Sequence, residues 1–135
     1  MTRRNEDAAL LNDIASTLTS SLELDEILNK TLALVMNYMK VEAGEIFLLE
    51  DDKRTLRMVL HRGQAAEAFW NRSRFSIGDG FPGLVAQTGE PIISMDLAKD
   101  ARFARDAVVQ AGFNQIACLP LKASGNMVGV LNVAT

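Results

Sequence analysis

Apolar residues near the start of the chain recur at the spacing of one helix face. The positions i, i+3, i+4 and i+7 are filled by Leu11, Ile14, Ala15 and Leu18. This spacing predicts an amphipathic helix over about residues 6–19. A second copy of the chain is the simplest partner for its apolar stripe, because contact between identical surfaces buries both at once.

A second helix is predicted after Thr19-Ser20-Ser21, which we expect to interrupt the first. Asp25 and Glu26 place negative charge where the positive end of a helix would lie, so the helix is predicted over about residues 25–40. Its apolar stripe is wide, which implies burial against a large surface. The stripe consists of Ile27, Leu28, Thr31, Leu32, Val35, Tyr38 and Met39.

The apolar period then changes to that of strands. Residues 43–50 form a short apolar run, and residues 55–62 alternate, with Leu56, Met58 and Leu60 opposing Arg57, Val59 and His61. The polar turn between these runs predicts an antiparallel hairpin. A second hairpin is predicted from residues 116–121 and 127–134, which are rich in Val, Ile and Leu.

Short elements are predicted between the two hairpins. They are a helix over residues 64–70, a strand at 75–77, a helix over 81–88, an extended segment at 91–94 and a helix over 100–112. Because the strands come in sequence-adjacent hairpins and the middle segment supplies helices and loops, the order predicts an α+β fold with one central antiparallel sheet.

Composition and charge narrow the class of protein. The chain has 135 residues, of which 48% are hydrophobic and 23% charged, as in a single soluble globular domain. The net charge of −3 gives no basic field for phosphate backbones, so we expect neither nucleic acid nor a membrane as a direct partner. No apolar run approaches the roughly 18 residues of a membrane span, and the amino terminus lacks a signal-peptide core. A cytoplasmic location is expected.

A glycine motif in the middle segment matches the dinucleotide-binding pattern G-x-G-x-x-G. It runs from Gly78 to Gly83, and Asp96 follows Gly78 by 18 residues, where a ribose-binding acid would lie. The helix after it spans only about two turns, and the chain is too short for the several parallel strands of a dinucleotide domain. We therefore interpret these glycines as residues that permit a tight turn.

Candidate catalytic and metal-binding residues are few. One cysteine and one histidine cannot form an internal disulfide or a zinc site with several thiolates or imidazoles. Cys118 lies in an apolar strand and is interpreted as a buried hydrophobe, and His61 as a solvent-facing sheet residue. Ser94, His61 and Asp96 could form a triad, but the nucleophile-elbow sequence G-x-S-x-G is missing. No enzyme activity and no cofactor are predicted.

Five arginines could hold an anionic ligand or an acidic partner helix. We expect most of them to be solvated or paired with nearby acids such as Asp100 and Asp106, because exposed ion pairs are common and contribute little. They are Arg62, Arg72, Arg74, Arg102 and Arg105.

Several sequence blocks fall in a characteristic order over about residues 10–134. They are Ser21–Leu28, Ala43–Leu49, Ile77–Pro91, Asp96 with Asp100–Phe103, Leu119–Leu121, Gly125 and Val128–Leu131. Together they resemble the GAF domains of signalling proteins. The resemblance implies a PAS-like antiparallel sheet with terminal helices on one face and, on the other, short helices and loops that cover a ligand pocket. It further implies that residues 1–135 are a single GAF domain, excised from a larger protein without its usual carboxyl-terminal helix, with an output domain in cis.

The known GAF subclasses can be compared with these residues. Bilin-binding members carry a cysteine before the last hairpin, whereas residues 96–113 contain none. Methionine-sulfoxide-reducing members need several cysteines to form a disulfide, and this chain has one. The cyclic-nucleotide signature would begin near Thr135, where the sequence stops, so that subclass is left open.

We therefore predict a non-catalytic sensory GAF domain that binds an unknown small molecule. The resemblance and the apolar positions nominate as pocket residues Phe47, Phe75, Ile77, Phe103, Val108, Phe113 and Ile116. The alternative is a GAF module without a ligand that acts as a homodimerisation element through Leu11, Ile14 and Leu18. The sequence identifies neither the ligand nor the output domain.

Overall fold

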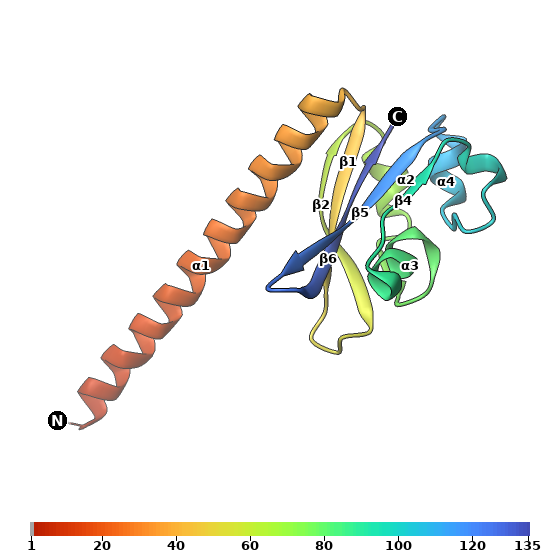
Figure 1. The fold of residues 1–135 in the computed structure, drawn as a ribbon. Coiled ribbons are helices and arrows are strands. Elements are labelled where there is room, and N and C mark those ends of the chain that lie inside the picture. The colour runs from red at the N-terminus through yellow and green to blue at the C-terminus, as the bar shows by residue number, and fades with distance from the viewer. Residues whose placement is uncertain (1) are drawn as a thin grey trace. The chain divides into compact units, whose positions relative to one another are not determined.

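The computed structural model describes the backbone of residues 2–135 and the side chains of residues 5–17, 19, 20 and 22–135 (Figure 1). Contacts divide the chain into two compact parts, one that ends at Thr31 and one that comprises Leu32–Thr135. We describe each part by itself.

Helix α1 runs without a break from Thr2 to Met39. The two helices predicted over residues 6–19 and 25–40 are therefore wrong as separate elements. The segment 19–21 contains neither proline nor glycine, and serine and threonine lower helix propensity only modestly. A hydroxyl inside a helix can also bond to the carbonyl four residues earlier, as Thr17 Oγ1 does to Asp13 O at 2.9 Å.

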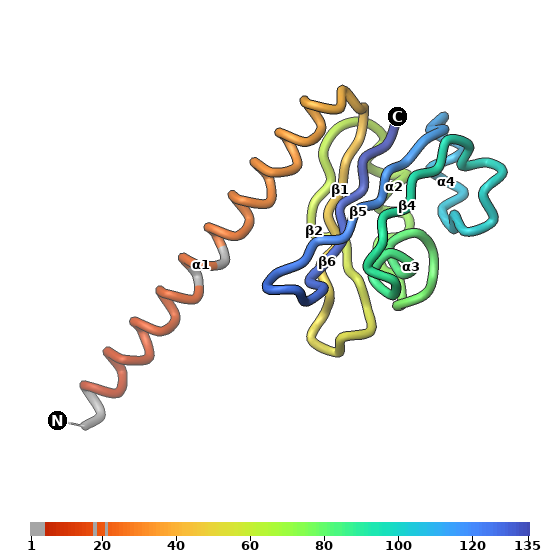
Figure 2. Tube along the Cα trace, viewed as in Figure 1, coloured from red at the N-terminus to blue at the C-terminus, as the bar shows by residue number. Residues whose placement is uncertain are grey.

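Six antiparallel strands form one sheet in the order β3-β2-β1-β6-β5-β4. The predicted sheet is confirmed, with the first and last hairpins side by side at its centre (Figure 2). An antiparallel sheet also excludes the parallel crossover that a dinucleotide site requires. The strands are β1 Ala43–Leu49, β2 Thr55–Gly63, β3 Arg74–Ser76, β4 Ile92–Ser94, β5 Ile116–Ala123 and β6 Asn126–Ala134.

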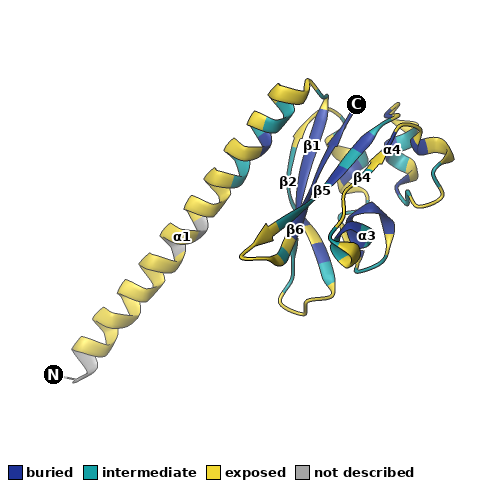
Figure 3. Ribbon diagram, viewed as in Figure 1, coloured by how far each residue is buried: buried dark blue, intermediate teal, exposed yellow. Residues whose placement is uncertain are grey.

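The last turns of α1 pack on one face of the sheet. A Cβ placed on Gly44 would lie 2.8 Å from Leu32 Cδ1 and 2.8 Å from Met36 Sδ, which shows how closely this strand and helix approach. Leu32 is fully buried there, and Ile46 of β1 is buried on the same side as Gly44. Strand β1 is buried along nearly its whole length because both of its faces are covered (Figure 3).

The opposite face is covered by the helices and loops of residues 64–115, which we call the lid; β3 and β4, within the same stretch of chain, belong to the sheet. The lid holds helices α2 Ala66–Trp70, α3 Gly80–Thr88 and α4 Asp106–Gln110, and the 3-10 helix η1 Leu97–Lys99. Contacts join α3 to β5 and β6 and join α2 to β2, so the lid lies over the sheet (Figure 1). The overall arrangement is the predicted α+β fold, with a helix on one face and short helices and loops on the other.

The predicted helix over residues 100–112 is wrong in extent, since only Asp106–Gln110 is α-helical. The Asp100 carboxylate accepts hydrogen bonds from the backbone N–H of Arg102 at 3.0 Å and from its guanidinium. This local turn competes with a helical start at the same residues. At the other end, Gly112 adopts φ +100°, which stops α4.

The glycine motif forms the turn that the sequence predicts. Gly78 and Gly80 have φ of +90° and +63°, a region that favours glycine. A Cβ on Gly83 would lie only 2.2 Å from Ser76 O, so the first turn of α3 rests directly on the backbone that precedes it. These glycines shape the passage from edge strand β3 into α3.

Candidate functional site

Four side chains form a row across the sheet, on the face under the lid. Strand register places His61 of β2 and Asn132 of β6 on either side of Glu45 of β1. Cys118 of β5 lies opposite Asn132. Residues directly opposite on neighbouring strands share one face. We call these four residues the polar row.

His61 reaches this row because β2 contains an irregularity. Ile46 pairs with Leu60 but Phe47 pairs with Met58, which leaves Val59 as an extra residue. Such a bulge reverses the alternation beyond it. The predicted face of Leu56, Met58 and Leu60 is therefore broken, and His61 turns inward. The expectation of a solvent-facing His61 is wrong: its ring lies 4.9 Å from that of Phe69, and Nε2 lies 3.0 Å from Gln64 O.

Arg105, from the loop before α4, lies buried above the row. Its guanidinium bonds both oxygens of Glu45, with Nη2 at 3.1 Å from Oε2 and Nη1 paired with Oε1. Asn132 Nδ2 donates to the same Oε1 at 3.0 Å, and Arg105 Nη2 also donates to Phe69 O at 2.5 Å. Arg105 is 3% exposed and Glu45 is fully buried. The expectation of a solvated arginine, or one paired with a nearby acid, is wrong for Arg105, because its partner lies 60 residues away.

Aromatic rings surround the guanidinium of Arg105. Its central carbon lies 5.0 Å from the ring centroid of Phe69 and 5.6 Å from those of Phe47 and Phe75. Such cation–π contacts are strongest where water is absent. The ion pair is therefore enclosed by apolar walls, which makes any unmet hydrogen-bonding capacity inside it expensive.

Three polar atoms at this site are buried without a hydrogen-bond partner among the described residues. They are Arg105 Nε, Asn132 Oδ1 and His61 Nδ1. Buried polar groups in folded proteins are nearly always bonded, so unmatched atoms call for an explanation. These three side chains, which with Glu45 we call the cluster, can each form one more hydrogen bond with a further polar group.

Cys118 is fully buried at the end of the row, as the sequence predicts. Burial raises the pKa of its thiol, and the charge of Glu45 raises that pKa further while Arg105 lowers it. The thiol therefore stays protonated at neutral pH, the opposite of what a nucleophile needs.

The residues considered as a triad are kept apart by the fold. Strands β1, β6 and β5 separate His61 on β2 from Ser94 on β4. The Ser94 side chain bonds Asp100, and the Asp96 carboxylate lies 4.0 Å from Lys99 Nζ. The structure gives no nucleophile and base in contact among these three residues.

The seven predicted pocket residues all belong to the interior under the lid. Phe47, Phe75, Val108, Phe113 and Ile116 are buried in its core, and Ile77 and Phe103 pack against that core. The ring centroids of Phe47 and Phe75 lie 5.5 Å apart, and that of Phe103 lies 5.1 Å from that of Phe81, a core residue outside the predicted set. Their role in ligand binding stays a prediction.

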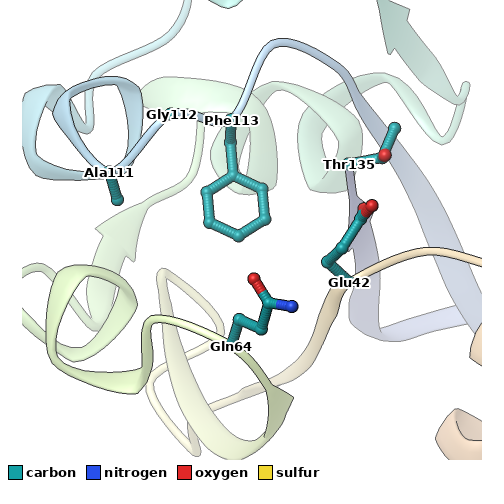
Figure 4. Close-up of a pocket in the computed structure, with 6 residues that line it drawn as sticks. All are labelled: Glu42, Gln64, Ala111, Gly112, Phe113 and Thr135. Carbon is teal, nitrogen blue, oxygen red and sulfur yellow. The ribbon is translucent and has the colours of Figure 1, made fainter.

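Three of these residues reach three different pockets. Ile116 lines one of about 200 Å³ beside Met39 and Ile93, and Phe103 lines one of about 190 Å³ beside Asp106. Phe113 lines a third of about 190 Å³, where its ring stands among Ala111, Gln64 and Glu42 (Figure 4). Gly112 and Thr135 complete its lining.

A single aromatic residue, Phe69, lies between the Phe113 pocket and the polar row. The Phe113 ring meets that of Phe69 edge to face at 5.1 Å. Phe69 in turn stacks near His61, and its carbonyl accepts a hydrogen bond from Arg105. Phe69 therefore contacts both Phe113 and Arg105.

Two further arginines, the half-buried Arg72 and the exposed Arg102, hold other parts of the lid. Arg72 pairs with Asp79, donates to Ala104 O at 3.3 Å and lies 4.4 Å from the Phe75 ring centroid. Arg102 bonds Asp100 with Nε at 2.9 Å and Nη2 at 2.7 Å. The guanidinium of Arg102 holds the pKa of Asp100 well below its usual value. These are the local pairings expected for the arginines.

The predicted dimer residues lie in the first part of the chain. Leu11 is 67% exposed and Ile14 is 47% exposed, whereas the side chain of Leu18 lies outside the described residues.

The described residues contain no helix with the length and apolar character of a membrane span. Among the same residues, no group of acidic, histidine or cysteine side chains is arranged to hold a metal ion.

A family model described as GAF domain matches residues 21–135. The chain belongs to the GAF domain family. A curated relative, the Nif-specific regulatory protein of Azospirillum lipoferum, is 29% identical over 133 residues, which cover 96% of this chain and 21% of the relative. This GAF domain thus spans about a fifth of that regulator, and it belongs to a type of module found in signalling proteins.

Solved structures support the same fold. A GAF domain from A. aeolicus, crystallised in an inactive state, has a TM-score of 0.68 and 25% identity, over 82% of this chain and 67% of that one. The free methionine-R-sulfoxide reductase from Neisseria meningitidis, solved with its substrate, has a TM-score of 0.64 and 17% identity, over 78% of this chain and 59% of that one. The GAF fold therefore hosts both regulators and enzymes, and this domain's role depends on its own residues.

Proposed function

We propose that this GAF domain is the sensory module of a larger regulatory protein and that it binds a small molecule under its lid. The observation that carries the proposal is the buried cluster of Arg105, Glu45 and Asn132, which has unmatched polar atoms inside an aromatic enclosure. A bound molecule that contacts Arg105 would favour one position of the loop before α4, and thus one arrangement of the lid helices.

The signal would pass to an output domain in cis. This part of the proposal is supported by the curated relatives, which are Nif-specific regulatory proteins about four to five times longer than the matched segment. Transmission requires only that the ligand bind the two arrangements with different affinity. We propose that the domain does this in the cytoplasm and without catalysis, since Cys118 is buried as a protonated thiol and His61 contacts a carbonyl and a ring.

A thermal-shift screen of the purified chain tests the binding. Nucleotides, small organic acids, inorganic anions and uncharged amides are added singly, because a compound that binds only the native state raises the unfolding midpoint. At roughly 100-fold above its Kd, a ligand stabilises by about 2.7 kcal/mol. If no compound moves the midpoint, the sensory proposal is wrong.

A double variant locates the binding in the cluster. Glu45→Leu with Arg105→Met removes both charges while keeping apolar volume, and we expect the ligand-induced shift to disappear. The matched control is Glu26→Gln with Lys30→Gln, which removes an exposed ion pair of α1, Lys30 Nζ to Glu26 Oε1 at 3.1 Å. The control should keep the full shift.

A second function is favoured by the apolar residues on the first part of α1. Leu11 and Ile14 expose large apolar side chains, which a second copy of the chain could cover. Leu18 continues this spacing in the sequence. On this alternative the domain is a homodimerisation element, and sedimentation of the Leu11→Lys and Ile14→Lys variants should show a monomer where the native chain is a dimer. Asn12→Lys, at an exposed polar position, is the control.

A further inference from the structure

We infer that the Phe113 pocket binds the ammonium group of a small aliphatic amine. The pocket shares no lining residue with the cluster around Glu45, so the inference does not rest on the proposed function. It follows from the charge of the lining, from the oxygen atoms that the lining offers and from the backbone that holds them.

The lining of this pocket carries one negative charge. The six described residues that form it include the carboxylate of Glu42 and no basic side chain. The Gln64 amide and the Thr135 hydroxyl supply two further oxygen atoms that accept hydrogen bonds. An ammonium group has three donors and the opposite charge, so it can bond all three side chains. An anion would meet the Glu42 carboxylate and be repelled by it.

The remaining lining suits a short carbon chain. The ring of Phe113, which is 6% exposed, and the methyl group of Ala111 form an apolar wall beside the oxygen atoms. The pocket encloses about 190 Å³. Since a water molecule occupies about 30 Å³ in the liquid, this volume corresponds to about six non-hydrogen atoms. An alkylamine of that size fits it.

A tight turn places Glu42 beside Gln64. Gly63, the last residue of β2, has φ +94°, and a Cβ there would lie only 2.1 Å from Glu42 O. The backbone N–H of Gln64 donates to the same Glu42 O at 2.9 Å. The two side chains therefore leave neighbouring points of the backbone. Figure 4 shows the Gln64 amide pointing toward the Phe113 ring and the Glu42 carboxylate toward Thr135.

Further backbone hydrogen bonds hold the opposite wall. The N–H groups of Asn114 and Gln115 both donate to Thr135 O at 3.0 Å, and Thr135 N–H donates to Gln115 O at 3.0 Å. These bonds tie the segment that carries Phe113 to the end of the sheet. Because the backbone on both sides is already ordered, a ligand has to order only side chains, which lowers the cost of binding.

Three probes with carbon chains of equal length test the inference on the isotope-labelled full chain. At neutral pH n-butylammonium is a cation, 1-butanol is uncharged and butyrate is an anion. Each is titrated at constant ionic strength while the NMR signals of the Gln64 side-chain amide and the Gly112 backbone amide are followed. For molecules this small we expect a Kd of about 1 to 100 mM.

We expect n-butylammonium to move both signals at a concentration at least about threefold lower than 1-butanol or butyrate does. This factor corresponds to about 0.7 kcal/mol, within the range measured for ion pairs that water reaches. Equal or tighter binding of 1-butanol or butyrate overturns the inference. A titration with n-butylammonium that moves neither signal also overturns it.

A single substitution tests the role of the carboxylate. Glu42→Gln removes the charge of the lining and keeps its shape, and the exposed position of Glu42 lets the variant fold. It should bind n-butylammonium no better than 1-butanol. The matched control is Asp106→Asn, which removes a carboxylate from a different pocket of about 190 Å³ and should keep the native preference. If Glu42→Gln keeps that preference too, the inference is wrong.

A fourth probe distinguishes a free amine from the lysine side chain of a partner protein. Nα-acetyl-lysine amide carries the same ammonium group on a peptide backbone, for which a volume of about 190 Å³ leaves no room. Binding no tighter than that of n-butylammonium supports a free amine. Tighter binding would assign the pocket to a lysine side chain and overturn the small-molecule class.

Discussion

At the scale of single residues, the buried ion pair of Glu45 and Arg105 has the largest expected effect on the stability of the interior. Removing two charges from water is unfavourable by several kcal/mol for each ion, and close contact offsets this only with good geometry and further hydrogen bonds. Here Asn132 and the carbonyl of Phe69 supply those bonds. The pair consequently fixes the loop before α4 over β1, at the centre of the sheet.

Breaking the pair on one side is expected to destabilise the domain strongly. Arg105→Met leaves the Glu45 carboxylate buried without its counterion, and we expect a loss of about 3 to 5 kcal/mol in the free energy of unfolding, measured by urea denaturation. The double variant with Glu45→Leu should recover most of that loss, because no buried charge then remains. A loss below about 1 kcal/mol in the single variant would show that the pair is not buried as described.

The pair of Asp100 and Arg102 predicts a pH dependence. Hydrogen bonds from Arg102 lower the pKa of Asp100 in the folded state below its usual value of 3.8. A group with a lowered folded pKa stabilises the protein above its usual pKa and loses this contribution as the pH falls toward the folded value. The Arg102 side chain is 51% exposed, so the contribution is no more than about 1 kcal/mol.

Chemical denaturation at several pH values checks this sign. The native chain should lose stability between about pH 4 and pH 2 more steeply than Asp100→Asn does. Asp106→Asn, at an exposed acid of the same lid segment, is the control and should keep the native slope. Equal slopes for the native chain and Asp100→Asn would contradict the assignment.

At the scale of elements, close approaches at glycine hold a helix against the chain beside it. Gly83→Ala would push a Cβ against the backbone oxygen Ser76 O at 2.2 Å, whereas Gly44→Ala would meet the flexible side-chain ends of Leu32 and Met36 at 2.8 Å. Backbone cannot yield as side chains can. We expect Gly83→Ala to lower the free energy of unfolding by about 1 to 3 kcal/mol, which a fall in the melting temperature would show. We expect Gly44→Ala to have the smaller effect. The reverse order would contradict this packing of α3.

Helix α1 offers a second contrast between elements. Leu32 is fully buried, while Leu34, two residues later on the same helix, is 71% exposed. Leu32→Ala should lower the free energy of unfolding by about 2 to 4 kcal/mol, and Leu34→Ala by less than about 0.5 kcal/mol. Similar losses in both variants, measured by urea denaturation, would show that this end of α1 is packed differently.

For the whole molecule, the division at Thr31 predicts which part folds alone. Residues 32–135 contain the complete sheet, the lid and the buried Leu32. A chain that lacks residues 1–24 should keep a cooperative melting transition within about 4 °C of the native one, since its core is unchanged. Any dependence of the native midpoint on protein concentration should vanish in this chain if residues 5–17 form the dimer contact. A truncated chain that does not fold would refute the division.

The extent of correct prediction differs between the fold and the site. The two hairpins and their antiparallel sheet were predictable, because β-branched runs and polar turns are local signals. The continuous α1 was not, since Thr19 and Ser20 interrupt an apolar pattern without breaking a helix. The seven pocket candidates all lie in the interior under the lid, but Glu45 and Asn132 were not identified as site residues. Arg105 was named only among five arginines, most of which were expected to be solvated or paired with a nearby acid. A charged residue in an otherwise apolar strand, Glu45 in AGEIFLL, was the one available signal.

The strands, the tight glycine turn and the family membership can be read from local sequence patterns, because periodicity and turn chemistry act over a few neighbouring residues. Which polar groups meet depends on the folded chain. A bulge at Val59 turns His61 inward, and folding of the lid carries Arg105 to a carboxylate 60 residues earlier in the chain. Such contacts depend on register and on the path of the chain in space, and no local pattern of residues encodes either of them.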